Sequence, residues 1–179
     1  MNYRTFLRIK KIHKFAQKVW GKEGSGILLV TDDEVLLQLR SKSVTLGDCW
    51  APPGGAIEET DGEYDSDDLG DYKPVSIRHA YESAVRELEE EGLKSNIDFK
   101  KKKWKDKLNH KKDHFLYRTF IVPITDKEKE KIKLDSSSDE VKKWEWFEKD
   151  EIPKKLHPGF KELVEGKFGK KHGFKIKGK

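Results

Sequence analysis

Residues 84–93 read AVRELEEEGL and place acidic side chains at helical spacing. Glu87, Glu90 and Glu91 stand at positions i, i+3 and i+4, which lie one above another on a single helix face. Like charges at this spacing repel one another and weaken an isolated helix. Divalent cations between the carboxylates would remove that repulsion, so the stretch predicts a metal site that acts on a phosphate. The alternative is a solvated acidic face on a charge-rich helix.

This helix is expected to begin near Ser76 or Ile77 and to end at Glu91, where Gly92 supplies the stop. Upstream, the stretch Trp50–Gly55 reads WAPPGG and cannot form a regular helix. Paired prolines and glycines interrupt the backbone there and leave bare N–H groups open to a ligand. A loop that approaches a ligand is therefore expected ahead of the acidic helix.

Strands are expected on both sides of that loop and helix. Residues 26–31 and 34–40 are apolar runs around an acidic turn at Asp32 and Asp33, which predicts a β-hairpin. Further predicted elements, in chain order, are a helix over residues 4–19, strands over residues 115–122 and 141–147, and a helix within residues 152–165 that starts after Pro158.

Length and composition favour one globular domain. The chain has 179 residues and a mass of 20.9 kDa, which suits a single domain over residues 1–179. Residues 1–23 are expected to form a helical extension, and residues 166–179 a basic tail that frays. Cys49 is the single cysteine, which excludes an internal disulfide, and no apolar run resembles a signal peptide or a membrane span. A cytoplasmic protein without a membrane partner is predicted.

Charge is gathered in two opposite blocks. Residues 58–71 hold eight acidic residues without Lys or Arg, whereas residues 100–112 hold eight lysines. One interpretation, which we favour on composition, is a pair of solvated loops that attract each other across the surface. The other interpretation gives Lys100–Lys112 a phosphate or an RNA to bind.

In this context the chain resembles the Nudix hydrolases, whose signature is G-x5-E-x7-R-E-U-x-E-E-x-G-U, with U a bulky aliphatic residue. Gly54 and Gly55 open a stretch like the start of this box, and residues 86–91 resemble its helix. The hairpin before the box, the strand around Tyr117 and Glu140 ahead of a Trp-rich strand agree with the family pattern. The resemblance implies an α/β fold of the Nudix type, an α/β/α sandwich with a mixed β-sheet between helices.

The first departure from that signature is an insertion. The family pattern puts Arg 14 positions after the box Gly, whereas Arg86 follows Gly55 by 31 positions, so 31 − 14 = 17 residues are extra. These residues fall in the acidic stretch 59–75. Asp61 holds the nominal position of the first box Glu, and Glu63 is the other candidate for that structural role.

The second departure is a deletion of one residue directly before Gly92. An alignment that counts backwards from Gly92 would put Arg86 where a carboxylate ligand belongs. The register fixed by Arg86 and Glu87 is therefore chemically preferable, and the helix ends one residue early. The geometry of Glu91 is the open point of the box.

The resemblance implies roles for the residues of the site. Glu87, Glu90 and Glu91 would bind Mg²⁺ or Mn²⁺ together with the backbone carbonyl of Gly55. Glu90 is the first choice for the base that accepts the proton of the attacking water, and Glu140 is the second. Six further residues complete the implied site, with substrate contacts from Arg40, Gly54 and Tyr117 and structural roles for Arg86, Glu63 and Gly92.

The function implied by the resemblance is metal-dependent hydrolysis of a pyrophosphate bond in a nucleoside diphosphate linked to another group, NDP-X, by attack of water at phosphorus. A nucleotide-derived small molecule is then the substrate. One alternative is an RNA 5′-end pyrophosphohydrolase or decapping enzyme, with the lysine block as the RNA contact. The alternative of another class is a catalytically weak nucleotide- or RNA-binding module. A homodimer is compatible with the resemblance, and the sequence does not identify X.

Overall fold

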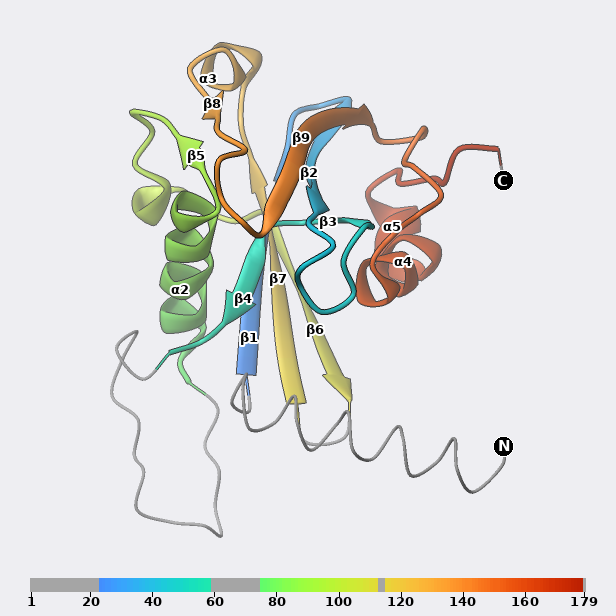
Figure 1. Ribbon diagram of the computed structural model, residues 1–179, viewed down its shortest axis with the longest axis horizontal. Helices are drawn as coiled ribbons and strands as arrows, with labels where there is room; N and C mark the ends of the chain where they lie inside the picture. The colour runs from blue at the N-terminus through green and yellow to red at the C-terminus, as the bar shows by residue number, and fades with distance from the viewer. Residues whose placement is uncertain (1–22, 59–74, 113–114, 179) are drawn as a thin grey trace, which may run out of the picture.

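The computed structural model describes residues 23–58, 75–112 and 115–178. The predicted helix over residues 4–19 lies outside these ranges, as do Glu63 and nearly all of the predicted insertion. The described residues form a mixed β-sheet with helices on both of its faces (Figure 1). This arrangement confirms the predicted α/β/α sandwich.

The main sheet of the described residues has seven strands and is centred on β1. The strands are, in chain order, β1 (Glu23–Val30), β2 (Glu34–Arg40), β3 (Trp50–Ala51), β4 (Gly54–Ala56), β6 (Asp106–Lys112), β7 (Phe115–Pro123) and β9 (Val141–Glu148). Their order is β3-β2-β1-β7-β6, with β4 paired to β1 and β9 paired to β2. Strands β1 and β7 run parallel, and the other pairs are antiparallel.

The predicted hairpin is confirmed as β1 and β2, in which Val30 lies opposite Val35. The predicted strands around Tyr117 and Trp144 are confirmed as β7 and β9. The stretch Trp50–Gly55 differs from the loop that was expected, because it contains β3 and the start of β4. Because glycine has no side chain, β4 can lie close against β1, and a Gly-rich stretch can pair as a strand here.

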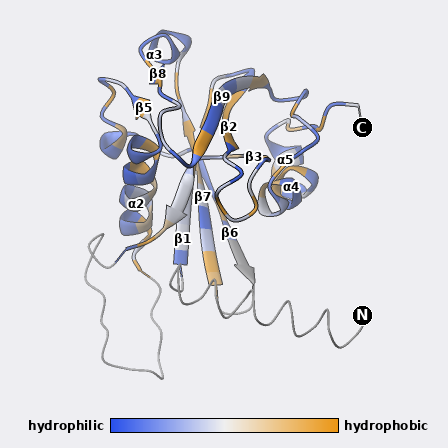
Figure 2. Cartoon of the chain, in the orientation of Figure 1, coloured by the Kyte–Doolittle hydropathy of each residue, from blue (hydrophilic) through white to orange (hydrophobic). Residues whose placement is uncertain are grey.

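Helices pack on the two opposite faces of the sheet. Helix α2 (Ile77–Glu90) covers one face, and α4 (Pro158–Glu165) and α5 (Lys167–Lys171) lie at the other (Figure 1). Hydrophilic and hydrophobic residues alternate along these helices, as Figure 2 shows, which is the pattern of helices with one buried side. No helix of the described ranges is long and apolar enough to cross a membrane.

The bounds of α2 follow from its two caps. The side chain of Ser76 accepts a hydrogen bond from the backbone N–H of His79 at 3.1 Å and so caps the first turn. At the other end Glu91 is the C-cap and Gly92 has a φ of +114°. A Cβ on Gly92 would lie 2.2 Å from the carbonyl oxygen of Asp135, so glycine is required there. The predicted start and stop of the helix are confirmed.

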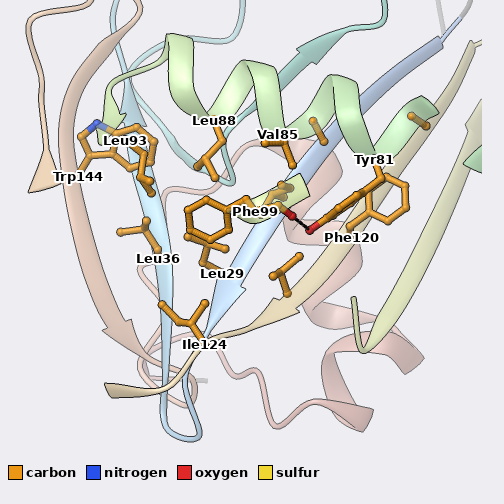
Figure 3. Packing of buried hydrophobic residues seen from close by; sticks show 14 of the residues in the cluster. Leu29, Leu36, Tyr81, Val85, Leu88, Leu93, Phe99, Phe120, Ile124 and Trp144 are labelled. Carbon is orange, nitrogen blue, oxygen red and sulfur yellow. Dashed lines mark hydrogen bonds between the residues drawn. The ribbon is translucent and has the colours of Figure 1, made fainter. Parts of the chain in front are cut away.

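The core under α2 is built from strand and helix side chains that meet between the two layers. Leu29 and Phe120 from the sheet pack below Val85 and Leu88 of the helix (Figure 3). Tyr81 is fully buried, and its hydroxyl donates a hydrogen bond to the backbone carbonyl of Phe99 at 2.8 Å. A second buried cluster, around Leu28 and Phe160, lies on the α4 side of the sheet. Helix α2 is therefore fixed to the sheet along its length.

The lysine block is not a single loop. The smaller elements are β5 (Leu93–Lys94), η2 (Phe99–Lys101), α3 (Asp126–Lys129) and β8 (Lys133–Leu134). Five of the lysines fall in η2 and in β6, which ends the strand order of the sheet, and Lys102, Lys103 and Lys105 lie in the segment between them. The favoured interpretation as a solvated loop is therefore wrong for the part that forms η2 and β6. The attraction expected between this block and the acidic block stays a prediction, because residues 59–74 lie outside the described residues. A lysine-rich edge strand resists pairing with other chains, and it lacks the apolar alternation by which strands are recognised.

The C-terminal tail is packed, contrary to the expectation that it frays. Phe174 and Ile176 are 3% and 5% exposed and belong to the cluster on the α4 side. The backbone N–H of Ile152 donates to the carbonyl of Lys175 at 2.9 Å. Asp106 of β6 accepts a hydrogen bond from Lys171 at 2.5 Å, which joins α5 to the sheet. Scattered apolar residues in a basic segment were the signal for this packing.

A buried ion pair joins β1, β7 and the start of α2. Glu23 and Arg118 are 1% and 4% exposed, and their side chains are in direct contact. The second carboxylate oxygen of Glu23 accepts a hydrogen bond from the backbone N–H of Val75 at 2.7 Å, and Arg118 donates to the carbonyl of Val75 at 3.3 Å. The backbone carbonyl of Glu23 accepts from the N–H of Ile57 at 3.1 Å. Glu23 thus holds the chain on both sides of the acidic insertion.

Arg118→Met is expected to lower the free energy of unfolding by about 3–5 kcal/mol at neutral pH, because it removes the buried guanidinium that contacts the Glu23 carboxylate. Adding Glu23→Gln should recover part of this loss, since the amide keeps an acceptor for the Val75 N–H without a charge. Urea denaturation monitored by tryptophan fluorescence measures both values.

The matched control is Lys177→Met, which breaks the exposed pair with Glu151. That change should cost less than about 1 kcal/mol, because exposed pairs are screened by solvent. Equal losses for the buried and the exposed pair would contradict the structural role of Arg118.

Candidate functional site

Strand β4 lies against β1 through contacts that only glycine allows. Gly54 is opposite Gly26, and Gly55 is opposite Ser25. Gly54 has a φ of +150°, and a Cβ there would lie 2.4 Å from the backbone oxygen of Ser25 and 2.5 Å from the Tyr117 hydroxyl. The predicted substrate residues Gly54 and Tyr117 are therefore direct neighbours, brought together from β4 and β7.

The ring of Tyr117 lies across the glycines of β1. A Cβ on Gly24 would stand 2.7 Å from the ring edge, and one on Gly26 would stand 2.6 Å from the hydroxyl. Burial raises the pKa of Tyr117 above its usual value, and the nearby carboxylates of Glu91 and Glu87 raise it further. The hydroxyl therefore stays protonated at neutral pH and faces the acidic residues of α2.

Glu87 projects from α2 toward β4 and is only 15% exposed. Its carboxylate packs on Gly55, where a Cβ would lie 2.3 Å from one of the carboxylate oxygens. Burial raises the pKa of Glu87 to about 7, even though the guanidinium of Arg86, 2.9 Å away, acts in the opposite direction. A side chain on residue 55 would displace this carboxylate, which explains the need for glycine next to the helix.

Arg86 connects α2 to the chain that follows β4. Its guanidinium pairs with Glu90 at 2.6 Å and with Glu87 at 2.9 Å, and it donates to the backbone carbonyl of Ala56 at 3.4 Å. Glu58 approaches to 3.9 Å. These contacts agree with the structural role inferred for Arg86 from the resemblance. The side chain of Glu90 is 58% exposed, so its pairing with Arg86 is at the surface.

Glu91 occupies a different environment from the two other carboxylates. It is 5% exposed, and one carboxylate oxygen accepts a hydrogen bond from Gln38 Nε2 at 2.7 Å. The other oxygen accepts from the backbone N–H of Gly54 at 3.0 Å. Burial raises the pKa of Glu91 to about 8, against the lowering effect of both hydrogen bonds. The single acidic face expected for α2 therefore divides into exposed, half-buried and buried positions.

Arg40 supplies positive charge at the end of β2. Its Nη2 donates to the carbonyl of Thr45 at 3.2 Å, while its Nε–H is buried and has no hydrogen-bond partner in the structure. The charge is close enough to lower the pKa values of Glu91 and His157. An arginine donor that is buried and unused is costly unless an anion satisfies it.

Glu140, the second candidate base, stands at the surface just before β9. Its backbone carbonyl accepts from the N–H of Ser41 at 2.8 Å, which ties it to the chain following Arg40. Its carboxylate contributes to the raised pKa of Glu87, so the two acidic groups lie within electrostatic reach of each other.

The structure brings together Glu87, Glu91, Gly54, Gly55 and Tyr117, with the remaining candidates at the edge of this group. Among the described residues, no three His, Cys, Asp or Glu side chains converge closely enough to hold a metal ion as they stand. The acceptor that sequence reasoning missed is Glu23, and the missed donors are Gln38 and Arg118. A polar residue within a buried apolar strand is the signal that marks Gln38 in the sequence.

The model of the NUDIX domain matches residues 22–166, which is most of the chain. The chain belongs to the Nudix family. The predicted family is confirmed, and with it the enzyme class, a pyrophosphohydrolase of the Nudix type. Comparison with curated proteins gives no match.

Solved structures of Nudix proteins share this fold. A MutT NUDIX hydrolase from Burkholderia pseudomallei is 19% identical, with a TM-score of 0.51 over 80% of this chain and 95% of that one. A bifunctional NMN adenylyltransferase/ADP ribose pyrophosphatase from Francisella tularensis, complexed with AMP and a manganese ion, is 14% identical with a TM-score of 0.50. That match covers 94% of this chain and 42% of the larger protein. At these identities the likeness concerns the fold alone.

The donor atoms of this Nudix site fit a hard divalent cation by their chemistry. Carboxylate and backbone oxygens are the ligands that Mg²⁺ and Mn²⁺ prefer. Burial raises the pKa of Glu87 even though the Arg86 guanidinium lies 2.9 Å away, so the charged carboxylate would gain from a further cation. A cation beside Glu87 would stabilise the charged form of its carboxylate. Glu90 lies one helical turn away and pairs with Arg86 only at the surface, where exchange for a cation costs little.

Protonation of His157 makes the free energy of unfolding of the protein depend on pH. Burial, assisted by Arg40, lowers the pKa of His157 to about 4 from its usual 6.5. Between these values the unfolded chain binds a proton that the folded chain excludes, so stability present above about pH 6.5 is lost toward pH 4. His157→Asn removes this titration and keeps a capping acceptor for the N–H of Gly159.

Urea denaturation of both proteins at about pH 7 and about pH 4.5 tests this effect. The variant should gain on the order of 2 kcal/mol relative to the wild type as the pH is lowered. Other titrating groups cancel in the difference between the two proteins. Parallel stability curves over this range would contradict a buried neutral histidine.

Proposed function

We propose that this Nudix enzyme hydrolyses the pyrophosphate bond of a nucleoside diphosphate linked to another group, NDP-X, with the help of Mg²⁺ or Mn²⁺. The observation that carries the proposal is the position of Arg40, whose buried Nε–H lacks an acceptor and whose charge acts on the buried carboxylate of Glu91 at the end of α2. A site for a metal-bound pyrophosphate needs negative and positive side chains next to each other. The carboxylate oxygens hold the metal ion, and a cationic donor such as arginine holds the phosphate.

The residues that would hold the cation are Glu87, Glu90 and Glu91, with the backbone carbonyl of Gly55 as a further oxygen donor. When bound, the metal would neutralise charge on the scissile phosphates and lower the pKa of a bound water. Arg40 orients a phosphate through its free Nε–H, and the protonated Tyr117 hydroxyl offers a neutral donor nearby. The glycines of β4 let a ligand approach the backbone closely.

A carboxylate must accept the proton of the attacking water. Glu90 is the first candidate because its side chain is 58% exposed and faces solvent at the edge of the site. Glu140 is the second, since it lies within electrostatic reach of Glu87 from a separate surface segment. Because Glu90 is also a proposed ligand, kcat for Glu90→Gln and Glu140→Gln is compared at saturating metal, where loss of the base should still lower kcat about 10²-fold or more.

The contacts of the lysine block favour a small substrate over RNA. Lys101 is paired with Asp98 at 2.8 Å, and Lys102 is paired with Glu128 at 2.5 Å. Part of the positive charge that RNA would need is therefore already neutralised within the protein. RNA with a 5′-triphosphate or a cap nevertheless belongs in the substrate panel as the competing result.

The experiment is a screen for release of a mononucleotide from ADP-ribose, dinucleoside polyphosphates, nucleoside triphosphates and the two RNA substrates. We expect turnover of an NDP-X compound with Mg²⁺ or Mn²⁺ and none with excess chelator, because the repulsion between water and pyrophosphate requires a cation. Measurable nucleotide binding without turnover on the whole panel would instead identify a catalytically weak binding module.

Glu87→Gln is expected to lower kcat about 10²-fold or more, because it removes charge at the point where the cation is held. Glu89→Gln is the matched control: it removes the same charge from the same helix at an exposed position. Steady-state kinetics at saturating metal compare the two variants. Similar losses from both would assign the effect to the overall charge of α2 and would count against Glu87 as a ligand.

Arg40→Ala should reduce kcat/KM by about 10- to 100-fold, chiefly through a higher KM, because a charge-assisted hydrogen bond to phosphate is worth about 1.5–3 kcal/mol. Lys42→Ala removes an exposed positive charge two residues away and should change kcat/KM little. The same reduction in both variants would point to general electrostatic attraction instead of a phosphate contact by Arg40.

A further inference from the structure

The loop of residues 41–49, which joins β2 to β3 (Figure 1), holds a leucine at the surface in an unfavourable backbone conformation. Leu46 has a φ of +55° and is 53% exposed. We infer that Leu46 makes an apolar contact with the base of the nucleotide substrate and selects for substrates that carry one. The inference rests on the proposed function, because it extends the site that holds the phosphates.

Leu46 occupies a turn position that favours other residues. The backbone N–H of Gly47 donates to the carbonyl of Val44 at 3.0 Å, which closes a four-residue turn with Leu46 in third place. A positive φ at this position is usually supplied by glycine or asparagine. For a bulky residue it is a genuine outlier, because Cβ comes too close to the following carbonyl oxygen. Local conformation therefore does not explain the leucine.

Packing within the protein does not explain it either. Among the described residues, Leu46 belongs to neither of the two buried clusters. Asp48, whose φ is +57°, shows the contrast. Aspartate tolerates this conformation, its N–H donates to the carbonyl of Arg40 at 2.9 Å, and its carboxylate pairs with Lys155 at 2.5 Å. Strain that internal contacts do not offset is concentrated at ligand sites and active sites.

The loop is joined to the arginine that we propose as the phosphate contact. Arg40 Nη2 donates at 3.2 Å to the carbonyl of Thr45, directly before Leu46. The Nε–H of the same guanidinium is buried and has no hydrogen-bond partner in the described part of the structure. A phosphate bound at Nε would lie at the foot of the loop, and the rest of the nucleotide could extend along it. The face of a base is its apolar surface, which suits contact with an exposed leucine.

The loop is ordered by further contacts, so Leu46 is presented before a ligand arrives. The Sγ–H of Cys49 donates to the carbonyl of Leu46 at 2.9 Å. The hydroxyl of Ser43 donates at 3.0 Å to the carbonyl of Asp139, in the segment before β9. A contact residue that is already fixed loses little conformational entropy on binding.

The test compares two ligands that resist hydrolysis and differ only in the nucleoside, α,β-methylene-ADP and methylenediphosphonate. Isothermal titration calorimetry with Mg²⁺ measures the Kd of each. Leu46→Gly and Leu46→Asn should weaken binding of α,β-methylene-ADP about fivefold or more, because the apolar contact is lost, and should change the Kd of methylenediphosphonate less than about twofold. Leu46→Met keeps an apolar side chain and should leave both Kd values within about twofold of the wild type.

Thermal unfolding without ligand separates a ligand contact from a structural role. Glycine and asparagine relieve the left-handed strain, so the Tm of Leu46→Gly and of Leu46→Asn should equal or exceed the wild-type value. Ile77→Ala is the matched control, because Ile77 is also an exposed apolar residue, at 46%. That variant should leave both Kd values unchanged.

Several results would overturn the inference. A Tm of both variants below the wild-type value would make Leu46 a structural residue. Equal weakening of both ligands, or of neither, would contradict a contact with the base, as would a wild type that binds both ligands equally well. If the wild type hydrolysed nothing in the substrate panel, the proposed function would fail, and the binding of α,β-methylene-ADP would still decide the role of Leu46.

Discussion

The buried ion pair between Glu23 and Arg118 connects parts of the chain that the sheet alone would leave separate. It joins the first residue of β1 to β7, and through Val75 it fixes the approach to α2. Because the charges are almost completely buried, separating them would cost about 3–5 kcal/mol of folding free energy. The position of α2 over the sheet, and with it every carboxylate of the site, depends on this contact together with the apolar core beneath the helix.

Neighbouring carboxylates of one helix have different surroundings. Glu90 is at the surface with Arg86, Glu87 is half buried on Gly55, and Glu91 is enclosed by Gln38 and Gly54. Sequence spacing gives the direction in which a helical side chain points, but it does not identify the residues that the side chain contacts. The partners come from β2 and β4, which lie far away along the chain, so the surroundings of these residues are decided by tertiary structure.

The sequence predicted the parts of the fold that have strong local signals. The caps of α2, the hairpin of β1 and β2, and the family box each combine a period with a stop or turn residue. It failed where those signals are absent. Strand β6 is rich in lysine and has no apolar alternation, and the tail buries Phe174 and Ile176 although its composition is basic. Gln38 and Arg118 act through long-range contacts, and no local pattern identifies their partners, Glu91 and Glu23.

Glu23 also explains how an enzyme of this fold tolerates a long interruption within its signature. Its backbone carbonyl holds Ile57 and its side chain holds Val75, so the two sides of the interruption are brought together by the folded body itself. Closing a loop between fixed ends costs entropy that grows only with the logarithm of its length, about 0.6 kcal/mol for each doubling. At that cost per doubling, a change in the number of residues between these anchors would alter the folding free energy little, because Glu23 holds Ile57 and Val75 from within the folded body.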